Sequence, residues 1–265
     1  MNRNDILTVN YDGALATVTI NRPEKKNAMS LDVLDGLYEI ARSFEKRSDV
    51  TAIILTGADG VFSAGVDLSD PKMAEVMTAP LAQKRKLMEY GPRMCGAWEA
   101  LDQITICAIE GFCVGGGVSL ACACDFRVMA ESAFIRVPEI GLAMNMSWAT
   151  IPRLVHLVGP ARTKEIVLFG ERVYARTACD WGFAQRVCPD NAAMEEAGKI
   201  AAKVLALPPM PAAMTKQTVN AVTNALDRSI AHMDADQFVL TLLSQDFKEG
   251  VEAFFQKRKP NFSGS

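Results

Sequence analysis

Residues 111–125 read GFCVGGGVSLACACD, so that three consecutive glycines, Gly115 to Gly117, separate two apolar runs. A glycine inside a helix costs about 1 kcal/mol relative to alanine, so a bare backbone at this point needs an explanation. Three explanations are open: phosphate binding, tight packing of a helix on a strand, and an anion site made of backbone N–H groups. Other stretches of the sequence discriminate between them.

Two phosphate-binding motifs fail on the residues present. The dinucleotide motif G-x-G-x-x-G would need glycine at 115, 117 and 120, but residue 120 is leucine. A P-loop that begins at Gly111 would need lysine after Gly116, and Gly117 stands there. The first N–H groups of a helix have no partner within it and lie at the positive end of its dipole. Glycines would let a ligand oxygen approach these groups, as an oxyanion hole requires, with close packing as the alternative.

The sequence offers few residues for other kinds of site. It contains two histidines, His156 and His232, and no G-x-S-x-G elbow, which disfavours a Ser–His triad. It has neither a CxxC pair nor an HExxH motif, and Cys122 and Cys124 are more typical of core thiols than of a metal site. We therefore expect no metal and no separate cofactor.

The composition is that of a soluble globular protein and disfavours two kinds of partner. A net charge of −3 over 265 residues argues against nucleic acid. The apolar runs are far shorter than the roughly 20 residues that span a bilayer, so no membrane partner is expected. The first residues, MNRNDILTVNYDG, lack the apolar region of a signal peptide. Seven irregularly spaced cysteines are typical of reduced core residues in a cytoplasmic protein.

Alternating strands and helices predict an α/β fold with a mostly parallel sheet covered by helices. Apolar or alternating runs bounded by turn residues predict strands at 14–20, 52–55, 104–109, 126–129 and 133–137. A helix is expected to begin after Ser30, which is a good N-cap. Beyond residue 150 the pattern is almost wholly helical, and further helices are expected at 191–206, 211–226 and 234–257.

A second glycine-containing stretch, ADGVFSAGVDL at 58–68, follows the strand predicted at 52–55. The pair FSAGVDL and GFCVGGG resembles the crotonase superfamily of enoyl-CoA hydratases and isomerases. Three more stretches resemble the family in the same order: NRPEKKNAMS at 21–30, VPEIGL at 137–142 and EGVEAFFQKRKPNF at 249–262. The resemblance covers nearly the whole chain. It implies a crotonase-like core of ββα repeats over residues 1–190, which holds the acyl-CoA site, and a helical C-terminal trimerisation region over 191–265, which also covers coenzyme A.

The resemblance also implies an oxyanion hole. In this family two backbone N–H groups hold the thioester carbonyl while charge builds on its oxygen as an enolate. The matching positions are Val66 and Gly116, and only their main chain is needed, which accounts for the valine. Removing one such donor typically lowers the rate by about 10²- to 10³-fold. For Asp67 the resemblance implies a structural role near the site.

Coenzyme A is implied as part of the substrate, an acyl-CoA thioester. It would run from the turn at 24–28 past the first glycine-containing stretch, and the basic end of the last helix would lie near its 3′-phosphate, often in a neighbouring subunit. A solvated tail is the alternative for that last position. The residues expected along this path are Lys25, Lys26, Ala28, Ala64, Asp67, Leu68 and Lys257.

The acid–base residues depart from those of the family's hydratases, which use two glutamates to hold and split a water. One glutamate matches Glu139, whose pKa burial would raise toward neutrality. The other would stand three residues after Gly116, where the chain has Ser119, a hydroxyl that can position water but cannot act as a base near pH 7. The family's glycine-rich stretch after VPEIGL is also replaced, by MNMSWAT at 144–150. There Asn145, Ser147 and Trp148 could line a pocket, or Trp148 could belong to the core.

A single carboxylate suits the transfer of a proton from C2 to C4, so the leading hypothesis is a 3-enoyl-CoA to 2-enoyl-CoA isomerase with Glu139 as the base. The nearest alternative is a 2-enoyl-CoA hydratase in which Ser119 or Asn145 orients the water. Weaker alternatives are an acyl-CoA hydrolase and a non-catalytic RNA-binding relative, the latter disfavoured by the acidic pI. The family's assemblies imply a homotrimer or a homohexamer. The acyl group stays open, although an apolar, adaptable segment is expected over it, with Met73, Met77, Leu81 and Met88.

Overall fold

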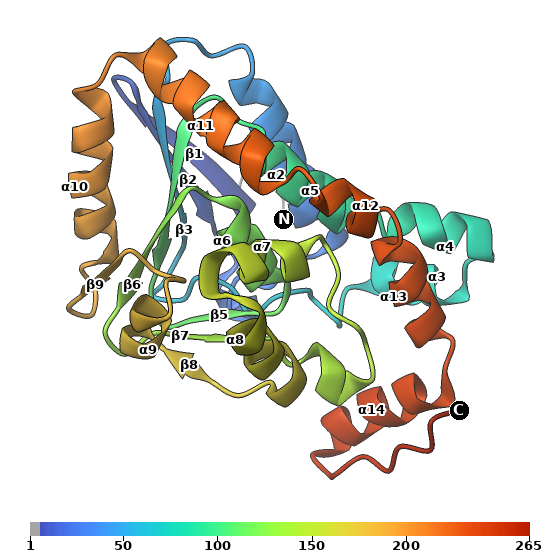
Figure 1. Ribbon diagram of the computed structural model, residues 1–265. Helices are drawn as coiled ribbons and strands as arrows, with labels where there is room; N and C mark the ends of the chain where they lie inside the picture. The colour runs from blue at the N-terminus through green and yellow to red at the C-terminus, as the bar shows by residue number, and fades with distance from the viewer. Residues whose placement is uncertain (1–5) are drawn as a thin grey trace.

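The computed structural model describes residues 6–265, apart from the side chains of Ala74, Met77 and Arg228. Its main sheet has the strand order β1-β2-β3-β4-β6-β9 (Figure 1). β1 and β2 are antiparallel, and every other neighbouring pair in this sheet is parallel. The strands are β1 (Leu7–Asp12), β2 (Leu15–Ile20), β3 (Ala52–Gly57), β4 (Ile104–Ile109), β6 (Phe126–Ala130) and β9 (Arg186–Cys188). The predicted α/β fold with a mostly parallel sheet is confirmed.

A second, smaller sheet has the order β5-β7-β8 and comprises β5 (Phe112–Val114), β7 (Phe134–Arg136) and β8 (Val173–Tyr174). All five predicted strands are present in the two sheets. β1, β5, β8 and β9 were not predicted. Three of these have only two or three residues, too few for a periodic pattern. β1 lies at the edge of the sheet and its second half is exposed, so it lacks an apolar run.

The two faces of the main sheet are covered by different helices. Side chains alternate between the faces along each strand, so Ile53 and Leu55 enter one core cluster and Ala52 and Ile54 another. The first cluster contains residues of α2 (Leu31–Phe44), α5 (Tyr90–Glu99) and α6 (Gly116–Ala123). The second contains residues of α10 (Ala193–Leu205), which Figure 1 shows on the opposite side of the sheet.

Local signals account for several helix boundaries. Ser30 is the N-cap of α2 and accepts a hydrogen bond from Val33 N, as predicted. The helix predicted over 234–257 is wrong as a single element, because it consists of α13 (Asp234–Leu242) and α14 (Gln245–Gln256). Ser244 has extended backbone angles and accepts a hydrogen bond from Phe247 N at 3.0 Å. Ser244 is therefore the N-cap of a second helix, although the continuous apolar periodicity had predicted a single helix through this point.

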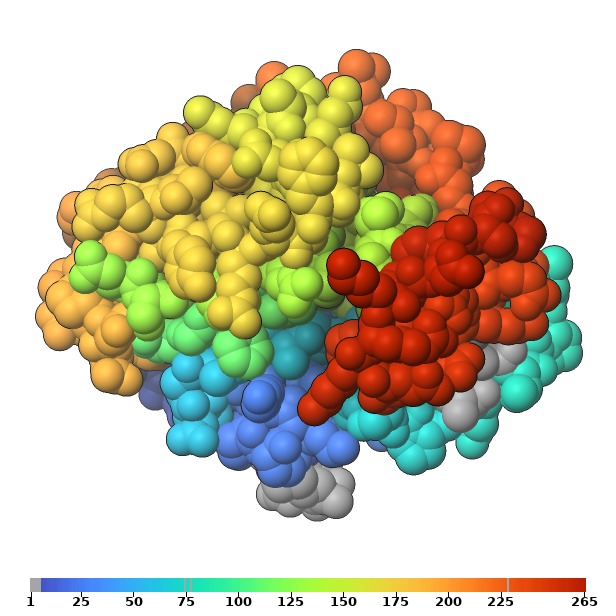
Figure 2. Space-filling view, turned by 90° about the horizontal axis from the view of Figure 1, so that it is seen from below, coloured from blue at the N-terminus to red at the C-terminus, as the bar shows by residue number. Residues whose placement is uncertain are grey.

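The C-terminal helices border a hollow in the surface (Figure 2). In Figure 2 the C-terminal segment in red forms one side of a hollow whose other side is the yellow and green part of the chain. Leu242 of α13 and Phe247 of α14 pack with Leu142 and Met144 in a small apolar cluster. The remaining α-helices are α3 (Pro71–Thr78), α4 (Leu81–Leu87), α7 (Thr150–Val158), α8 (Pro160–Lys164), α9 (Ala175–Asp180), α11 (Pro209–Thr223) and α12 (Asp227–Ala231). Within residues 6–265, no helix combines the length and the apolarity that crossing a membrane requires.

Candidate active site

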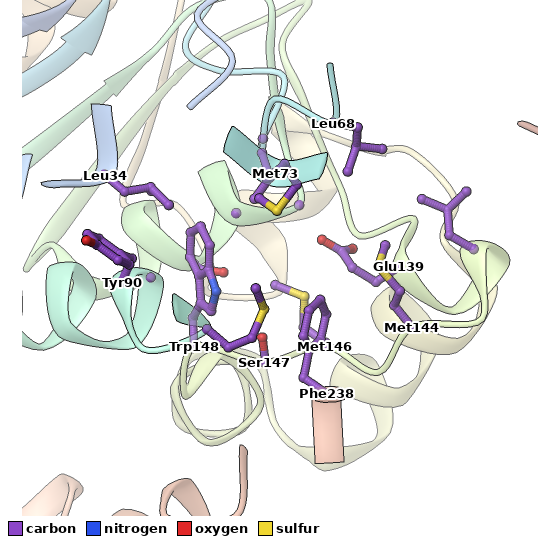
Figure 3. A pocket seen from close by; sticks show the side chains of 18 of the residues that line it. Leu34, Leu68, Met73, Tyr90, Glu139, Met144, Met146, Ser147, Trp148 and Phe238 are labelled. Carbon is purple, nitrogen blue, oxygen red and sulfur yellow. The ribbon is translucent and has the colours of Figure 1, made fainter. Parts of the chain in front are cut away.

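A cavity of about 160 Å³ lies where the two glycine-containing stretches meet the turn that begins at Glu139. In Figure 3 the Glu139 carboxyl, the Trp148 indole and the side chains of Met73 and Met146 point into this space. Most of the lining is apolar. It includes Ala64, Gly65, Val66, Leu68, Met73, Met88, Tyr90, Gly91, Gly115, Gly116, Ser119, Glu139, Leu142, Met144, Met146, Ser147, Trp148, Phe238, Leu242 and Phe247.

The two glycine-containing stretches are joined by backbone contacts. Ser63 N donates to Phe112 O at 3.1 Å, and Val114 N donates to Ser63 O at 3.0 Å. Gly65 has φ +89°, and a Cβ placed on it would lie 2.7 Å from Val114 O and 3.4 Å from Gly116 N. A side chain at Gly65 would therefore separate the stretches.

Val66 and Gly116, the two predicted oxyanion donors, both line the cavity. Met29 N donates to Gly65 O at 2.7 Å, and Asp67 N donates to Met29 O at 3.0 Å. These two bonds form a parallel β-bridge between Met29 and Val66 in which the N–H of Val66 itself takes no part. Gly116 is the first residue of α6, where N–H groups have no partner within the helix. In the described part of the chain, neither N–H donates to a protein acceptor. Two residues of the cavity lining thus have main-chain N–H groups without a described protein acceptor, as the predicted oxyanion hole requires.

Each of the three consecutive glycines packs closely against a different residue. A Cβ on Gly115, which has φ +53°, would lie 2.5 Å from Glu139 Oε1, and one on Gly116 would lie 2.7 Å from the Trp148 ring. A Cβ on Gly117 would lie 3.1 Å from Ser63 Cβ. Close packing, one of the explanations that the sequence left open, therefore applies at all three glycines, and access for a ligand oxygen stays a prediction.

Glu139 begins the short 3₁₀ turn Glu139–Leu142, just after β7. Its Oε2 is buried and has no hydrogen-bond partner among the described residues. Burial raises the pKa of Glu139 to about 7, against smaller lowering effects from its own backbone N–H and from Arg136. No other acidic residue belongs to the described lining of the cavity. One carboxyl group that titrates near neutrality thus faces the space beside Gly115.

Ser119 is fully buried in α6, and its hydroxyl contacts another hydroxyl. Thr150 Oγ1 lies 2.7 Å from Ser119 Oγ and donates to the Ser147 carbonyl at 2.6 Å. Asn145, which the sequence analysis considered as a water-orienting residue, is not part of the lining. Its Oδ1 accepts from Thr241 Oγ1 at 3.3 Å.

Asp67 ties the first glycine-containing stretch to the turn before α2. Its carboxylate accepts from Arg22 Nη2 at 3.0 Å and from Ser69 N and Oγ at 3.0 and 2.6 Å. Burial alone would raise the pKa of Asp67, but hydrogen bonds from Ser69 and Arg22 outweigh it and hold the pKa below its usual value. Arg22 also donates to Ala28 O, so this ion pair fixes both segments.

The residues predicted along the coenzyme A path lie at several places. Ala64 and Leu68 line the cavity, whereas the other predicted residues of the path do not. Lys25 Nζ donates to Ser69 Oγ at 3.2 Å, and Lys26 Nζ lies 6.0 Å from the centre of the Phe112 ring. Ala28 is buried next to them, and Lys257 is an exposed residue at the end of α14.

Several lining residues were missed at the sequence level. Tyr90 and Gly91 come from α5, and Phe238, Leu242 and Phe247 come from α13 and α14. Of the predicted apolar segment, Met73 and Met88 line the cavity and Leu81 does not, while the side chain of Met77 lies outside the described residues. Apolar residues at helical spacing were the available signal, and that signal does not distinguish core from cavity.

Within residues 6–265, no group of three or more His, Cys, Asp or Glu side chains is placed to hold a metal ion.

Comparison with known proteins agrees with this geometry. A family model described as enoyl-CoA hydratase/isomerase matches residues 10–265. The chain is 32% identical over 250 residues to a crotonyl-CoA hydratase of Syntrophomonas wolfei, covering 94% of each. It is 31% identical over 254 residues to a mitochondrial enoyl-CoA hydratase of Pongo abelii, covering 95% of this chain and 84% of the relative.

A solved structure of an enoyl-CoA hydratase from Mycobacterium avium subsp. paratuberculosis K-10 has a TM-score of 0.87 to this chain at 27% identity. The match covers 97% of this chain and 98% of the chain in that structure. A second, an enoyl-CoA hydratase/isomerase from Pseudoalteromonas atlantica, also has a TM-score of 0.87, at 28% identity, covering 97% of this chain and 100% of its own. The resemblance noted in the sequence is confirmed, and the chain belongs to the enoyl-CoA hydratase/isomerase family, the crotonase superfamily.

Proposed function

We propose that the protein converts 3-enoyl-CoA into 2-enoyl-CoA thioesters, with Glu139 as its one acid–base residue. The observation that carries this proposal is the cavity lining, in which Glu139 is the single acidic residue described and lies against Gly115. Family membership supplies the class of substrate, a coenzyme A thioester.

In the proposed reaction the thioester oxygen accepts hydrogen bonds from Val66 N–H and Gly116 N–H. These bonds stabilise the negative charge that forms on the oxygen when Glu139 removes a proton from C2. The C2–H electrons form the enolate, and the double bond moves from C3–C4 to C2–C3 as C4 takes the proton back from the same carboxyl group. Atoms and charge balance with one residue, which is a base first and an acid second.

The pKa of about 7 suits both halves of this cycle. A group whose pKa lies near the working pH is present in both forms and transfers protons efficiently in either direction. An ordinary exposed glutamate would be a weaker base by more than two pKa units, since its reference pKa is 4.5.

Hydration of 2-enoyl-CoA is the second candidate. It is favoured by two of the relatives compared above, which are named hydratases, and by the presence of Ser119 in the cavity lining. In that reaction Ser119 would orient the water, and Glu139 would both activate it and protonate C2.

The test is an assay of the purified protein with 3-hexenoyl-CoA and with crotonyl-CoA, beside Glu139→Gln and Ser119→Ala. Isomerisation that falls at least 100-fold in Glu139→Gln, persists in Ser119→Ala and occurs without water addition to crotonyl-CoA supports the proposal. Hydration of crotonyl-CoA that is faster than isomerisation and is lost in Ser119→Ala would replace it with the hydratase. Release of free coenzyme A thiol would indicate a hydrolase.

We further propose that coenzyme A passes Ala64 and Leu68 toward Lys25 and Lys26, with Lys257 at its 3′-phosphate. The hydrogen bond from Lys25 to Ser69 supports this path, because Ser69 directly follows Leu68, which lines the cavity. Substituting Lys25 and Lys26 with alanine should raise the KM for the thioester more than it lowers kcat.

The helical region after residue 190 is proposed as the interface of a homotrimer or homohexamer in the cytoplasm. Large exposed apolar side chains concentrate there, which is unusual for a free surface. They include Met210, Met214, Val219, Val222, Leu226, Ile230, Leu240, Leu243, Phe254 and Phe255. Sedimentation equilibrium that gives a monomer at micromolar concentration would contradict this assembly.

A further inference from the structure

Trp148 has a backbone conformation that bulky residues rarely adopt. Its φ is +64°, and the next residue, Ala149, has φ +52°. Two successive left-handed residues with side chains are strained, and such strain persists only where the surroundings impose it, often at functional sites. The position of the Trp148 side chain therefore calls for a role that outweighs the strain.

Two contacts hold this conformation, one from the distant helix α13 and one from α7, the helix that follows Trp148. Asp234 Oδ2 on α13 accepts from Ala149 N at 2.7 Å, and Arg153 Nη1 donates to Trp148 O at 2.7 Å. Arg153 is itself fixed by Glu99 on α5, through bonds of 2.7 and 3.0 Å. The backbone of Trp148 is thus bound from two sides.

The indole occupies a space left open by two glycines. A Cβ on Gly91 would lie 1.8 Å from Trp148 Cε2, and a Cβ on Gly116 would lie 2.7 Å from Cζ3. The ring therefore lies directly against the backbone of α5 and against the residue whose N–H is the proposed oxyanion donor. Figure 3 shows the ring in the wall of the cavity near Tyr90.

The size of the remaining cavity limits what the acyl group can be. At about 160 Å³ it is close to the roughly 150 Å³ of an engineered apolar cavity that holds one benzene molecule. An acyl group whose carbonyl oxygen is bound at Val66 and Gly116 must place its next carbon atoms beside the Trp148 ring.

We propose that Trp148 is the residue that sets the acyl specificity of this site, and that it restricts the substrate to short acyl groups of about six carbon atoms or one ring. This inference rests on the proposed function, because that function places the thioester oxygen at Gly116. Gly91 is a positioning residue in it, since only glycine leaves room for the indole.

The first test measures binding as well as turnover. Isothermal titration gives the Kd of butyryl-, hexanoyl-, octanoyl- and decanoyl-CoA for the wild type, Trp148→Ala and Trp148→Phe, with Trp181→Ala as the control. Trp181 packs near Arg162, is not part of the described cavity lining and should leave the profile unchanged. Kinetics with 3-enoyl-CoA esters of the same lengths are run beside it.

We expect the wild type to bind hexanoyl-CoA best and decanoyl-CoA at least 10-fold more weakly. One misfitting methylene in an apolar pocket already changes specificity by about 10-fold or more. Trp148→Ala should shift the ratio of decanoyl- to butyryl-CoA affinity at least 10-fold toward the longer chain, with Trp148→Phe between it and the wild type. A ratio within twofold of the wild type in both variants overturns the inference.

Gly91→Ala provides an independent test, because its methyl group would occupy the indole position. It should displace the ring and so change the ratio of decanoyl- to butyryl-CoA affinity. The double variant Gly91→Ala/Trp148→Ala, in which the clash is absent, should show the chain-length profile of Trp148→Ala. Gly91→Ala with an unaltered profile would contradict the assigned role.

The two proposals fail separately. A shifted binding profile with no turnover of any enoyl-CoA would retain Trp148 as the specificity residue and refute the isomerase. Isomerisation of 3-enoyl-CoA with an unshifted binding profile would retain the isomerase and refute Trp148 as the specificity residue.

Discussion

Replacing Glu139 by glutamine should abolish a loss of stability that the wild type undergoes as the pH rises, and the pKa of Glu139 fixes the size of that loss. The folded state raises the pKa of Glu139 from 4.5 to about 7, so the folded protein holds this proton more tightly than the unfolded chain. The stability that this proton contributes is fully present below pH 4.5 and is lost as pH rises through about 7. The full loss is about 3 kcal/mol, at about 1.4 kcal/mol per pKa unit. Between pH 5 and pH 8 it is roughly 2.5 kcal/mol.

Urea unfolding of the wild type and of Glu139→Gln at pH 5 and pH 8 measures this quantity. The free energy of unfolding of the variant minus that of the wild type should increase by roughly 2 to 3 kcal/mol from pH 5 to pH 8. Any packing or hydrogen-bonding cost of the amide is present at both pH values and cancels in this comparison. Glu39→Gln, at an exposed position on α2, is the matched control and should show no such increase. If the variant and the wild type differed in free energy of unfolding by the same amount at both pH values, the argument that burial raises the pKa of Glu139 would be refuted.

Three further outcomes follow from the site. The kcat/KM of isomerisation should rise with pH and level off above about 7, because Glu139 must be ionised to remove the proton, and a flat profile from pH 5.5 to 8.5 would contradict this. Gly115→Ala should lower kcat at least 100-fold with little loss of secondary structure by circular dichroism, since its methyl group would meet Glu139 Oε1 and its φ is +53°. Thr150→Val removes the hydroxyl that contacts Ser119, so it should slow hydration more than isomerisation if the protein performs both, and equal effects would argue against a water held by Ser119.

The parts of the fold that the sequence predicted well are those with local causes. A run such as residues 52–55 is apolar on both faces because it is covered on both, and the N-cap at Ser30 is a contact three residues long. The two glycine-containing stretches each follow a parallel strand, and the ends of parallel strands lie at one edge of a sheet. Their meeting at the cavity follows from this topology, although the sequence analysis paired them through the family resemblance.

The missed parts depend on contacts between distant residues. Gly91 and Trp148 are far apart in the sequence, and nothing local to either indicates that one makes room for the other. Asp234 holds Ala149 across 85 positions, and Phe238 reaches the cavity from the same helix. The roles of Val66, Gly116, Ser119 and Glu139 were inferred from family resemblance, and these roles stay predictions until the substitutions are made.

The proposed use of backbone groups at Val66 and Gly116 has a consequence for how the chemistry of this scaffold can change. A point mutation replaces side chains and leaves amide groups in place, so activation of a thioester by these two groups would survive almost any substitution that keeps the loops in contact. The fate of the activated acyl group would then depend on a few replaceable side chains around it, namely those at 119, 139 and 148. Such a division makes the site a favourable starting point for directed evolution, in which new reactions are selected without rebuilding the step that makes them possible.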